Sequence, residues 1–409
     1  MTDQAHMTVI DRCRICDNTD LLPVLDLGTQ ALTGVFPRTL DEPVPRVPLE
    51  LVVCSPSGCG LVQLRHTADF GLMYGERYGY RSGLNRSMVE HLRGKVAAIT
   101  DMVELGAGDM VVDIGSNDGT LLSAYPADGP TLVGVDPAAS AFAEFYPPHI
   151  ERITGFFSRD LLGGRRAKVV TSIAMFYDLP RPLDFMREVR ELLTDDGIWV
   201  IEQSYMPAML RATAYDVVCH EHLDYYALRQ IEWMAERAGL KVLDAELNAV
   251  YGGSLSVVLA RRTARSQVNE AALATIRGGE KDLPLASFAR RTVEHRDRLL
   301  DFLAESRKNG LLTLGYGAST KGNVILQYCG LGEADLPCIA EVNHDKFGCY
   351  TPATGIPIVS EEEAKARRPD QFLVLPWIYR EPVIARERDF LRSGGRLVFP
   401  LPELEVVKA

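Results

Sequence analysis

The chain lacks a long apolar run, because the roughly 18 consecutive apolar residues that a membrane-spanning helix needs do not occur anywhere in it. Its first residues, MTDQAHMTVIDRC, lack a basic stretch followed by an apolar core, so we expect no secretory signal. We therefore expect a cytoplasmic protein that does not engage a membrane. Low-complexity tracts are also missing, and a length of 409 residues predicts two or three folded domains.

Positive charge is in deficit, since 44 Lys and Arg stand against 55 Asp and Glu, for a net charge of −11. Arg pairs at 165–166, 261–262 and 290–291 are scattered and form no basic stripe of the kind that binds nucleic acid. This balance favours a small-molecule substrate over a nucleic acid. Because the sequence also shows no long uncovered apolar seam, we expect a monomer.

The eight cysteines are unevenly placed, with four of them in the first 59 residues. Cys13 and Cys16 form a CxxC pair, and Cys54 and Cys59 form a second pair with four residues between them. Zinc needs four tetrahedrally arranged thiolates, which two tight turns can present. Unrelated thiols or a redox pair are the alternatives, but a redox CxxC should open a helix of a thioredoxin-like unit, and this one does not. The cluster therefore predicts structural Zn²⁺ with no open coordination position.

Short strands alternate with helix-length segments in two separate series. The first begins with MVVDIG, after an amphipathic stretch from Asn85 to about Leu105, and the second begins with LLTLGYGAS, after a charged helix expected over 284–308. Such alternation predicts an α/β protein with mostly parallel, doubly wound sheets. We expect a zinc-binding module at 1–75, a central Rossmann-like domain at 76–265 and a second Rossmann-like α/β domain at 266–409.

The turn in VVDIGSNDGTLL connects a strand to a helix, and its two glycines let the backbone approach a ligand closely. Asp136 ends the next strand about twenty residues later, where a carboxylate can accept both hydroxyls of a ribose. Asp113 and Asp118 would repel a pyrophosphate but suit the cationic sulfonium of S-adenosylmethionine, so a methyltransferase domain is predicted. Phe156 or Phe157 could flank the adenine, with core packing as the alternative. The expected cofactor-binding residues are Asp113, Gly115, Asn117, Gly119, Asp136 and Phe156.

The segment CHEHLDYY, residues 219–226, concentrates polar side chains after the predicted strand GIWVIEQ, at the edge of an α/β sheet where substrates bind. A histidine titrates near neutral pH and a neighbouring Glu can fix its tautomer, so we expect acid–base chemistry. A second metal site is one alternative, although HEH lacks the i,i+4 histidine pair of a helical zinc motif. A solvated polar loop is the other.

The chain contains, in this order, the motifs CxxC…CxxxxC, YGYRSG, VVDIGSNDGTLL, HEHLDYY, GGSLSVV and GYGASTKGN. Together they resemble the motifs of the nucleotide-sugar C-methyltransferases, which act on nucleotide-linked 4-ketosugars in deoxysugar and antibiotic biosynthesis. The resemblance spans nearly the whole chain. It implies that a base removes the proton beside the ketone, at C-3, of a 4-keto-deoxysugar that we expect to be dTDP-linked. The enolate carbon then attacks the methyl group of S-adenosylmethionine.

The resemblance assigns His222 as the base, with Glu221 beside it. Tyr78 and Tyr80 become candidate donors to the enolate oxygen, and packing between the first two modules is their alternative role. In the last domain GYGASTKG is a glycine-rich strand–helix turn without an acid, which suits the diphosphate of a nucleotide sugar. The expected substrate-binding residues are Tyr316, Ser319, Lys321, Asn323 and Tyr225.

The chain departs from the family pattern at three places. Cys219 stands where a Tyr is usual, Tyr251 stands where a His commonly precedes GGSL, and PWIYR replaces an AWNY-like segment. These departures predict an unusual substrate or a shifted methylation position. An O- or N-methyltransferase for a small metabolite is the main alternative, since it needs only a base near a hydroxyl or an amine. A zinc-ribbon protein that modifies RNA is disfavoured by the acidic net charge.

Overall fold

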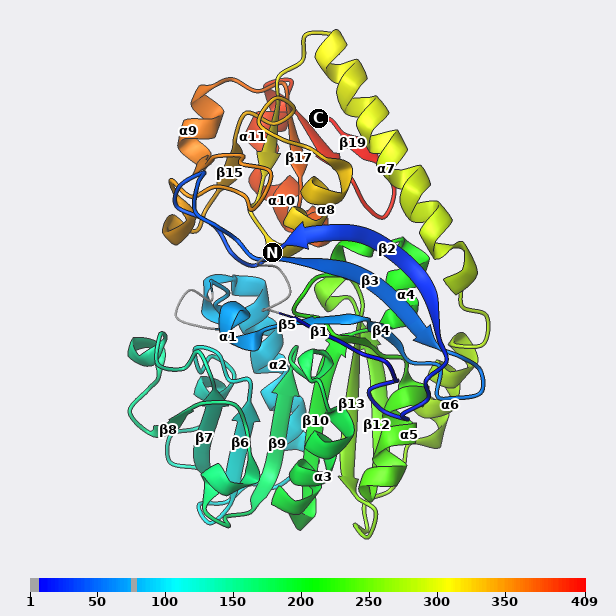
Figure 1. Ribbon diagram of the computed structural model, residues 1–409. Helices are drawn as coiled ribbons and strands as arrows, with labels where there is room; N and C mark the ends of the chain where they lie inside the picture. The colour runs from blue at the N-terminus through cyan, green and yellow to red at the C-terminus, as the bar shows by residue number, and fades with distance from the viewer. Residues whose placement is uncertain (1–6, 75–78) are drawn as a thin grey trace.

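The computed structural model describes residues 7–74 and 79–409. Its N-terminal part is a curved antiparallel sheet (Figure 1). Its strand order is β11-β4-β3-β2. Strand β11 comes from the middle of the chain, so Asp224 and Tyr225 of the polar segment 219–226 form a strand of the N-terminal sheet. A second, two-stranded sheet pairs β1 with β5. The elements are β1 (Met7–Val9), β2 (Leu21–Ala31), β3 (Arg46–Cys54), β4 (Val62–Leu64), β5 (His66–Ala68), β11 (Asp224–Tyr225) and α1 (Phe70–Met73).

The central sheet has seven strands in the order β12-β13-β10-β9-β6-β7-β8. Strand β13 pairs antiparallel with β10 and β12, and the other neighbours are parallel. The carboxyl ends of the parallel strands therefore meet at one edge, where a ligand can bind. The strands are β6 (Met110–Ile114), β7 (Thr131–Asp136), β8 (Ile150–Thr154), β9 (Ala167–Ile173), β10 (Leu193–Ser204), β12 (Leu240–Asn248) and β13 (Ser254–Arg261).

Helices cover both faces of the central sheet because successive side chains of each buried strand point to opposite faces. Val111 belongs to the apolar cluster that contains Leu92 of α2, whereas the next residue, Val112, belongs to the cluster that contains Met186 of α3. A continuous apolar run such as MVVDI is therefore the sequence of a strand buried on both sides. The helices of this part are α2 (Arg86–Met102), α3 (Pro182–Leu192), α4 (Met206–Ala212), α5 (Leu228–Ala238) and α6 (Glu270–Gly279).

The C-terminal sheet has the strand order β16-β15-β14-β17-β18-β19. Counted along the chain this is 3-2-1-4-5-6, the doubly wound order in which a ligand binds where the order reverses, beside β14. Helix α7 runs along this sheet and reaches β2 of the N-terminal sheet (Figure 1). The elements are α7 (Leu285–Lys308), β14 (Thr313–Tyr316), α8 (Thr320–Cys329), β15 (Ile339–Glu341), β16 (Ile358–Ser360), α9 (Glu361–Ala366), β17 (Gln371–Val374), α10 (Arg380–Arg386), α11 (Arg388–Arg392), β18 (Arg396–Phe399) and β19 (Glu405–Val407).

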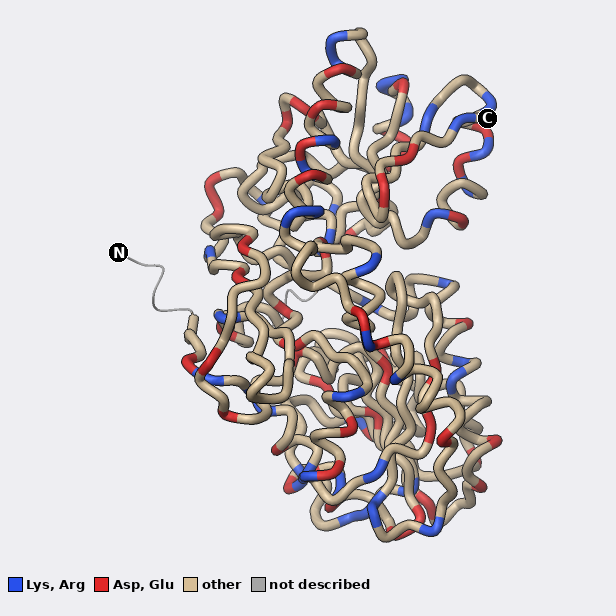
Figure 2. The backbone as a smooth tube through the Cα atoms, turned by 90° about the vertical axis from the view of Figure 1, so that its right-hand side faces the viewer, with Lys and Arg blue, Asp and Glu red and all other residues tan. Residues whose placement is uncertain are grey.

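The predicted fold class is confirmed: an N-terminal module with the cysteine cluster precedes two α/β sheets. The exact domain limits of 1–75, 76–265 and 266–409 stay a prediction. None of the helices in residues 7–74 and 79–409 is both long and apolar enough to cross a membrane. In the view of Figure 2 basic and acidic residues are intermixed over the upper and the lower part of the molecule.

A buried hydrogen bond connects the central and C-terminal parts. The indole Nε1 of Trp377 donates to Oδ2 of Asp216 over 2.8 Å. Asp216 is 1% exposed, and its other oxygen has no hydrogen-bond partner among the described residues. A buried carboxylate that loses a donor retains the full cost of its desolvation, so this bond has more effect on stability than an exposed one.

We predict that Trp377→Phe lowers the free energy of unfolding by about 1–3 kcal/mol, because Asp216 would then lack its donor while remaining buried. A urea titration followed by circular dichroism measures the change. Trp233→Phe is the matched control, since that ring packs on the guanidinium of Arg237 at the surface. Equal losses in the two variants would contradict the importance of the bond.

Candidate functional site

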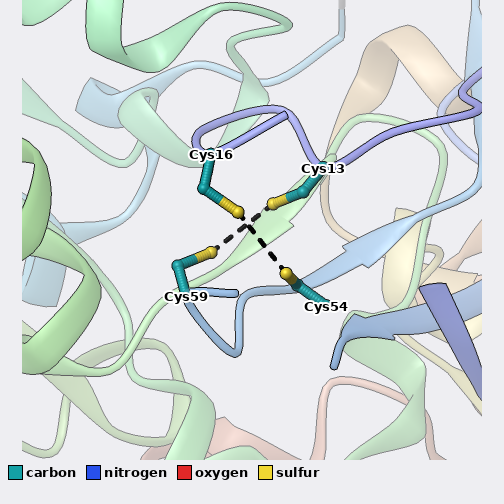
Figure 3. Close-up of side chains that lie close together, drawn as sticks. All are labelled: Cys13, Cys16, Cys54 and Cys59. Atoms are coloured by element: carbon teal, nitrogen blue, oxygen red, sulfur yellow. Dashed lines mark hydrogen bonds between the residues drawn. The ribbon is translucent and has the colours of Figure 1, made fainter. Parts of the chain in front are cut away.

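The four N-terminal cysteines converge on one point (Figure 3). The Sγ atoms of Cys13 and Cys59 lie 3.5 Å apart, as do those of Cys16 and Cys54, and all four lie within 4.8 Å of one another. Thiolates about 2.3 Å from a tetrahedral Zn²⁺ would be separated by roughly 3.8 Å, so the cluster fits the metal. All four are free thiols. Because they fill the coordination sphere, the Zn²⁺ is structural.

A cavity of about 400 Å³ opens at the carboxyl ends of β6, β7 and β9. Five of the predicted cofactor residues line it: Asp113, Gly115, Asn117, Asp136 and Phe156. Gly119 instead packs against Tyr146, and its φ of +74° requires a residue without a side chain. Phe157 packs on Phe185 with ring centroids 5.3 Å apart, whereas Phe156 is 59% exposed at the cavity. The turn follows β6 as the sequence predicts, but the expectation that it leads into a helix is wrong, since only the three-residue 3-10 helix Leu122–Ala124 follows it.

The cavity carries buried acidic groups that suit a cation. Asp136 accepts hydrogen bonds from the backbone N–H groups of Asn117 at 2.9 Å and Ala138 at 2.7 Å. Each carboxylate oxygen keeps a lone pair for a ligand hydroxyl. Burial raises the pKa of Asp113 to about 7, although the hydroxyl of Thr171 donates to it at 2.6 Å. A positively charged ligand would reverse that shift, so these residues fit S-adenosylmethionine.

His222 lies at the junction of the central and C-terminal parts. Its Nδ1–H donates to the carbonyl of Val217 over 3.0 Å, which leaves Nε2 as the unprotonated nitrogen. Burial, together with the positive charge of Lys321, lowers the pKa of His222 to about 3. The ring of Tyr177 packs on the imidazole with centroids 4.3 Å apart. The imidazole is therefore neutral at pH 7 and has a fixed tautomer.

Glu221 is next to His222, and burial raises the pKa of its carboxyl. Asp178, which the sequence analysis did not single out, lines the same 400 Å³ cavity and accepts a hydrogen bond from the hydroxyl of Tyr74 at 2.9 Å. Burial raises the pKa of Asp178 well above its ordinary value, and Glu221 and Asp224 add to the shift. It lies five residues after the end of β9, at the carboxyl edge of the sheet, and that place was the signal that could have identified it.

Of the two tyrosines in YGYRSG, Tyr78 lies outside the described residues, and Tyr80 lines the cavity beside Tyr251. The backbone of this segment is held by the glycine-rich turn after β6, since Asn117 Nδ2 donates to the carbonyl of Tyr80 at 3.0 Å. Tyr251 has a φ of +57°, a strained value for a residue with a side chain. The catalytic role of the tyrosines stays a prediction.

The predicted substrate residues are placed unequally. Lys321 is half-buried near His222, and its Nζ donates to the carbonyl of Tyr251 over 3.5 Å. Ser319 caps α8 by accepting from the N–H of Gly322 at 3.0 Å. The other three use their polar groups within the protein, and whether they bind substrate stays a prediction. Tyr316 donates to Glu387, Asn323 donates to the carbonyl of Thr33 and Tyr225 donates to the carbonyl of Val217.

The glycine-rich turn of the C-terminal sheet has an acidic neighbour that its own sequence does not contain. Glu341, at the end of β15, accepts from the N–H of Ala318 at 2.7 Å. The same carboxylate also accepts from the N–H groups of Val342 and Asn343. The turn GYGASTKG itself contains no acidic residue, as expected, but the carboxylate of Glu341 lies next to it.

Comparison with known proteins agrees with this geometry. Family models match three consecutive parts of the chain: a zinc binding domain at 13–74, a methyltransferase domain at 88–245 and a C-methyltransferase C-terminal domain at 249–402. The C-methyltransferase NovU of Streptomyces niveus is 31% identical over 413 residues, covering 98% of this chain and 97% of that protein. The chain is thus an S-adenosylmethionine-dependent methyltransferase with a structural zinc module. It belongs to the C-methyltransferase family.

Solved structures resemble only part of the chain. The mitomycin 7-O-methyltransferase MmcR is 18% identical with a TM-score of 0.36, covering 46% of this chain and 56% of that one. The CcbJ methyltransferase of Streptomyces caelestis is 19% identical with a TM-score of 0.33, covering 41% of this chain and 89% of that one.

We predict that Cys54→Ser abolishes stoichiometric zinc binding and lowers the melting temperature, because three thiolates and a hydroxyl hold Zn²⁺ poorly. Zinc is measured by atomic emission and melting by calorimetry. Cys349→Ser, at a buried cysteine outside the cluster, is the control and should retain the metal. Retention of zinc by Cys54→Ser would show that the cluster is not the site.

We predict that Asp136→Asn weakens S-adenosylmethionine binding by about 10- to 100-fold, since hydrogen bonds to a charged group contribute roughly 1.5–3 kcal/mol. Isothermal titration calorimetry measures the dissociation constant. Asp128→Asn, at an exposed position in the loop before β7, should bind as the wild type does. An unchanged constant in Asp136→Asn would remove this carboxylate from the cofactor site.

Proposed function

We propose that this protein methylates the carbon next to the ketone, C-3 in the leading case, of a nucleotide-linked 4-keto-deoxysugar, with dTDP as the first carrier to test. The observation that supports it is the neutral His222 imidazole, whose free Nε2 lies at the junction with Lys321 and the glycine-rich turn of the C-terminal sheet. C-methylation needs a base for a carbon acid, whereas nucleotide recognition needs a cationic, N–H-rich turn.

In the proposed mechanism Nε2 of His222 removes the proton beside the ketone. The carboxylate of Glu221 offsets the positive charge that the imidazolium acquires. Tyr78 and Tyr80 are the candidate donors to the enolate oxygen, where a preorganised donor lowers the barrier. S-adenosylmethionine, when bound, supplies an electrophilic methyl group, and Asp113, Asp136 and Phe156 would orient it.

Lys321 connects substrate binding to the basicity of His222. In the substrate-free protein its positive charge contributes to the low pKa of the imidazole. A diphosphate beside Lys321 would neutralise this effect, and the pKa of His222 would rise toward the range of an effective base. Ser319, which caps α8, and the helix N-terminus would hold the same diphosphate.

We predict that His222→Asn lowers turnover by about 10²- to 10⁴-fold, the usual contribution of general base catalysis, while S-adenosylmethionine still binds. Asn keeps a similar volume and a donor for the carbonyl of Val217, so folding should be preserved. His344→Asn, at an exposed histidine, is the control. Retained turnover in His222→Asn would show that another group is the base.

The substrate class is tested by incubating the enzyme with S-adenosylmethionine and a panel of dTDP- and UDP-linked 4-ketosugars in heavy water. We expect a product heavier by one methylene and deuterium in unreacted substrate at the carbon beside the ketone. Methyl transfer without any exchange at carbon would support the O- or N-methyltransferase alternative. Mass spectrometry of product and remaining substrate separates the two results.

A further inference from the structure

The turn that follows β2 in the zinc module lies against Glu221. Thr33 is fully buried, and its Oγ1 donates to Oε2 of Glu221 over 3.5 Å. The next residue, Gly34, faces the other carboxylate oxygen, because a Cβ at Gly34 would lie 2.3 Å from Oε1 of Glu221. Both oxygens of the Glu221 carboxylate are thus bounded by two successive residues that precede it by almost 190 positions.

Position 34 has no room for a side chain, because the Glu221 carboxylate lies against it. Gly34 is absent from the residues with positive φ in the described part of the chain, so its backbone conformation is open to other residues. A methyl group there would overlap Glu221 and lie 3.6 Å from Oγ1 of Thr320. Any side chain at position 34 must therefore displace the Glu221 carboxylate.

Helix α8 also holds the segment that contains the turn. Asn323 Nδ2 donates to the carbonyl of Thr33 over 2.7 Å. Gln327 both accepts from the N–H of Ala31 at 2.8 Å and donates to its carbonyl at 3.1 Å. Asn323 and Gln327 are four positions apart and so share one face of the helix. The helix that begins at the glycine-rich turn therefore determines where Thr33 and Gly34 lie.

We propose that the Thr33–Gly34 turn of the zinc module positions Glu221 for catalysis. The inference rests on the proposed role of the Glu221–His222 pair. The zinc module would then contribute to turnover. Its sheet ends in the Thr33–Gly34 turn, α8 holds this turn by hydrogen bonds, and the turn determines where the Glu221 carboxylate lies beside His222. Thr33 and Gly34 are positioning residues, since they act through Glu221.

Crystal structures of Thr33→Val, Thr33→Ser and Gly34→Ala test the positioning directly and need no substrate. We expect the Glu221 carboxylate to move by about 1 Å or more in Gly34→Ala, with the zinc cluster and the His222–Val217 hydrogen bond intact. An unmoved carboxylate in both Gly34→Ala and Thr33→Val would overturn the proposal. If Gly34→Ala does not fold, the valine and serine variants carry the test alone.

Turnover and substrate exchange test the consequence for catalysis. A misplacement of about 1 Å can cost on the order of 100-fold in rate, so Gly34→Ala should lose about that factor in kcat, with KM and cofactor affinity little changed. Thr33→Val should lose about three- to tenfold, the effect of one net hydrogen bond, and Thr33→Ser should restore it. Wild-type kcat in a variant whose carboxylate has moved would also overturn the proposal.

Matched controls separate this inference from the proposed function. Thr29→Val changes an exposed residue of β2. Gly94→Ala changes a residue of α2 at which an added Cβ meets no atom within 4 Å. Both should retain wild-type turnover. If Glu221→Gln itself keeps full turnover, the proposed catalytic pair is wrong, whereas a slow Glu221→Gln beside fully active Thr33 and Gly34 variants refutes only the positioning.

Discussion

The pairing of β11 with β4 is the interaction on which the arrangement of the site depends. Asp224 lies opposite Gln63, and Tyr225 lies opposite Val62, so the residues after the HEH triplet form an edge strand of the N-terminal sheet. The side chain of Asp224 is fully buried. Burial raises its pKa to about 7, even though the positive charge of Arg14, 3.9 Å away, lowers the pKa. Because a buried polar group tolerates little displacement, Asp224 has a fixed position. His222, two residues before it in the chain, is therefore also restricted in position.

Two glycine-rich turns with opposite electrostatic surroundings face ligands of opposite charge in the proposed reaction. The turn after β6 is accompanied by the buried carboxylates of Asp113 and Asp136. The turn after β14 is followed by Lys321, while Glu341 has its charge satisfied by three backbone N–H groups. The side chains around the first turn thus suit a cation, whereas those around the second suit an anion.

Local features of the site were predictable from the sequence, whereas contacts between distant segments were not. The spacing of the cysteines and the order Asp113, Gly115, Asp136 determine a metal cluster and a turn, because the residues involved lie in short, continuous stretches whose geometry follows from strand and turn rules. The long helix expected over 284–308 agrees with Leu285–Lys308, whereas the helix-length segments between β6 and β9 form only short 3-10 helices. Thr33 lies beside Glu221 only through tertiary packing, and no periodicity encodes that proximity. Asn323 was expected to bind substrate, but its side chain donates a hydrogen bond to the backbone carbonyl of Thr33 in the N-terminal module.

The strand that the central part contributes to the N-terminal sheet has a consequence for synthesis on the ribosome. All four zinc-binding cysteines have emerged soon after residue 59, but β4 lacks its partner β11 until residue 225 has followed. At about 5–20 residues per second this interval lasts roughly ten to thirty seconds. During that time the edge of β4 has no strand beside it, and Zn²⁺ bound to the four thiolates would be the link that already joins the turn before β2 to the end of β3.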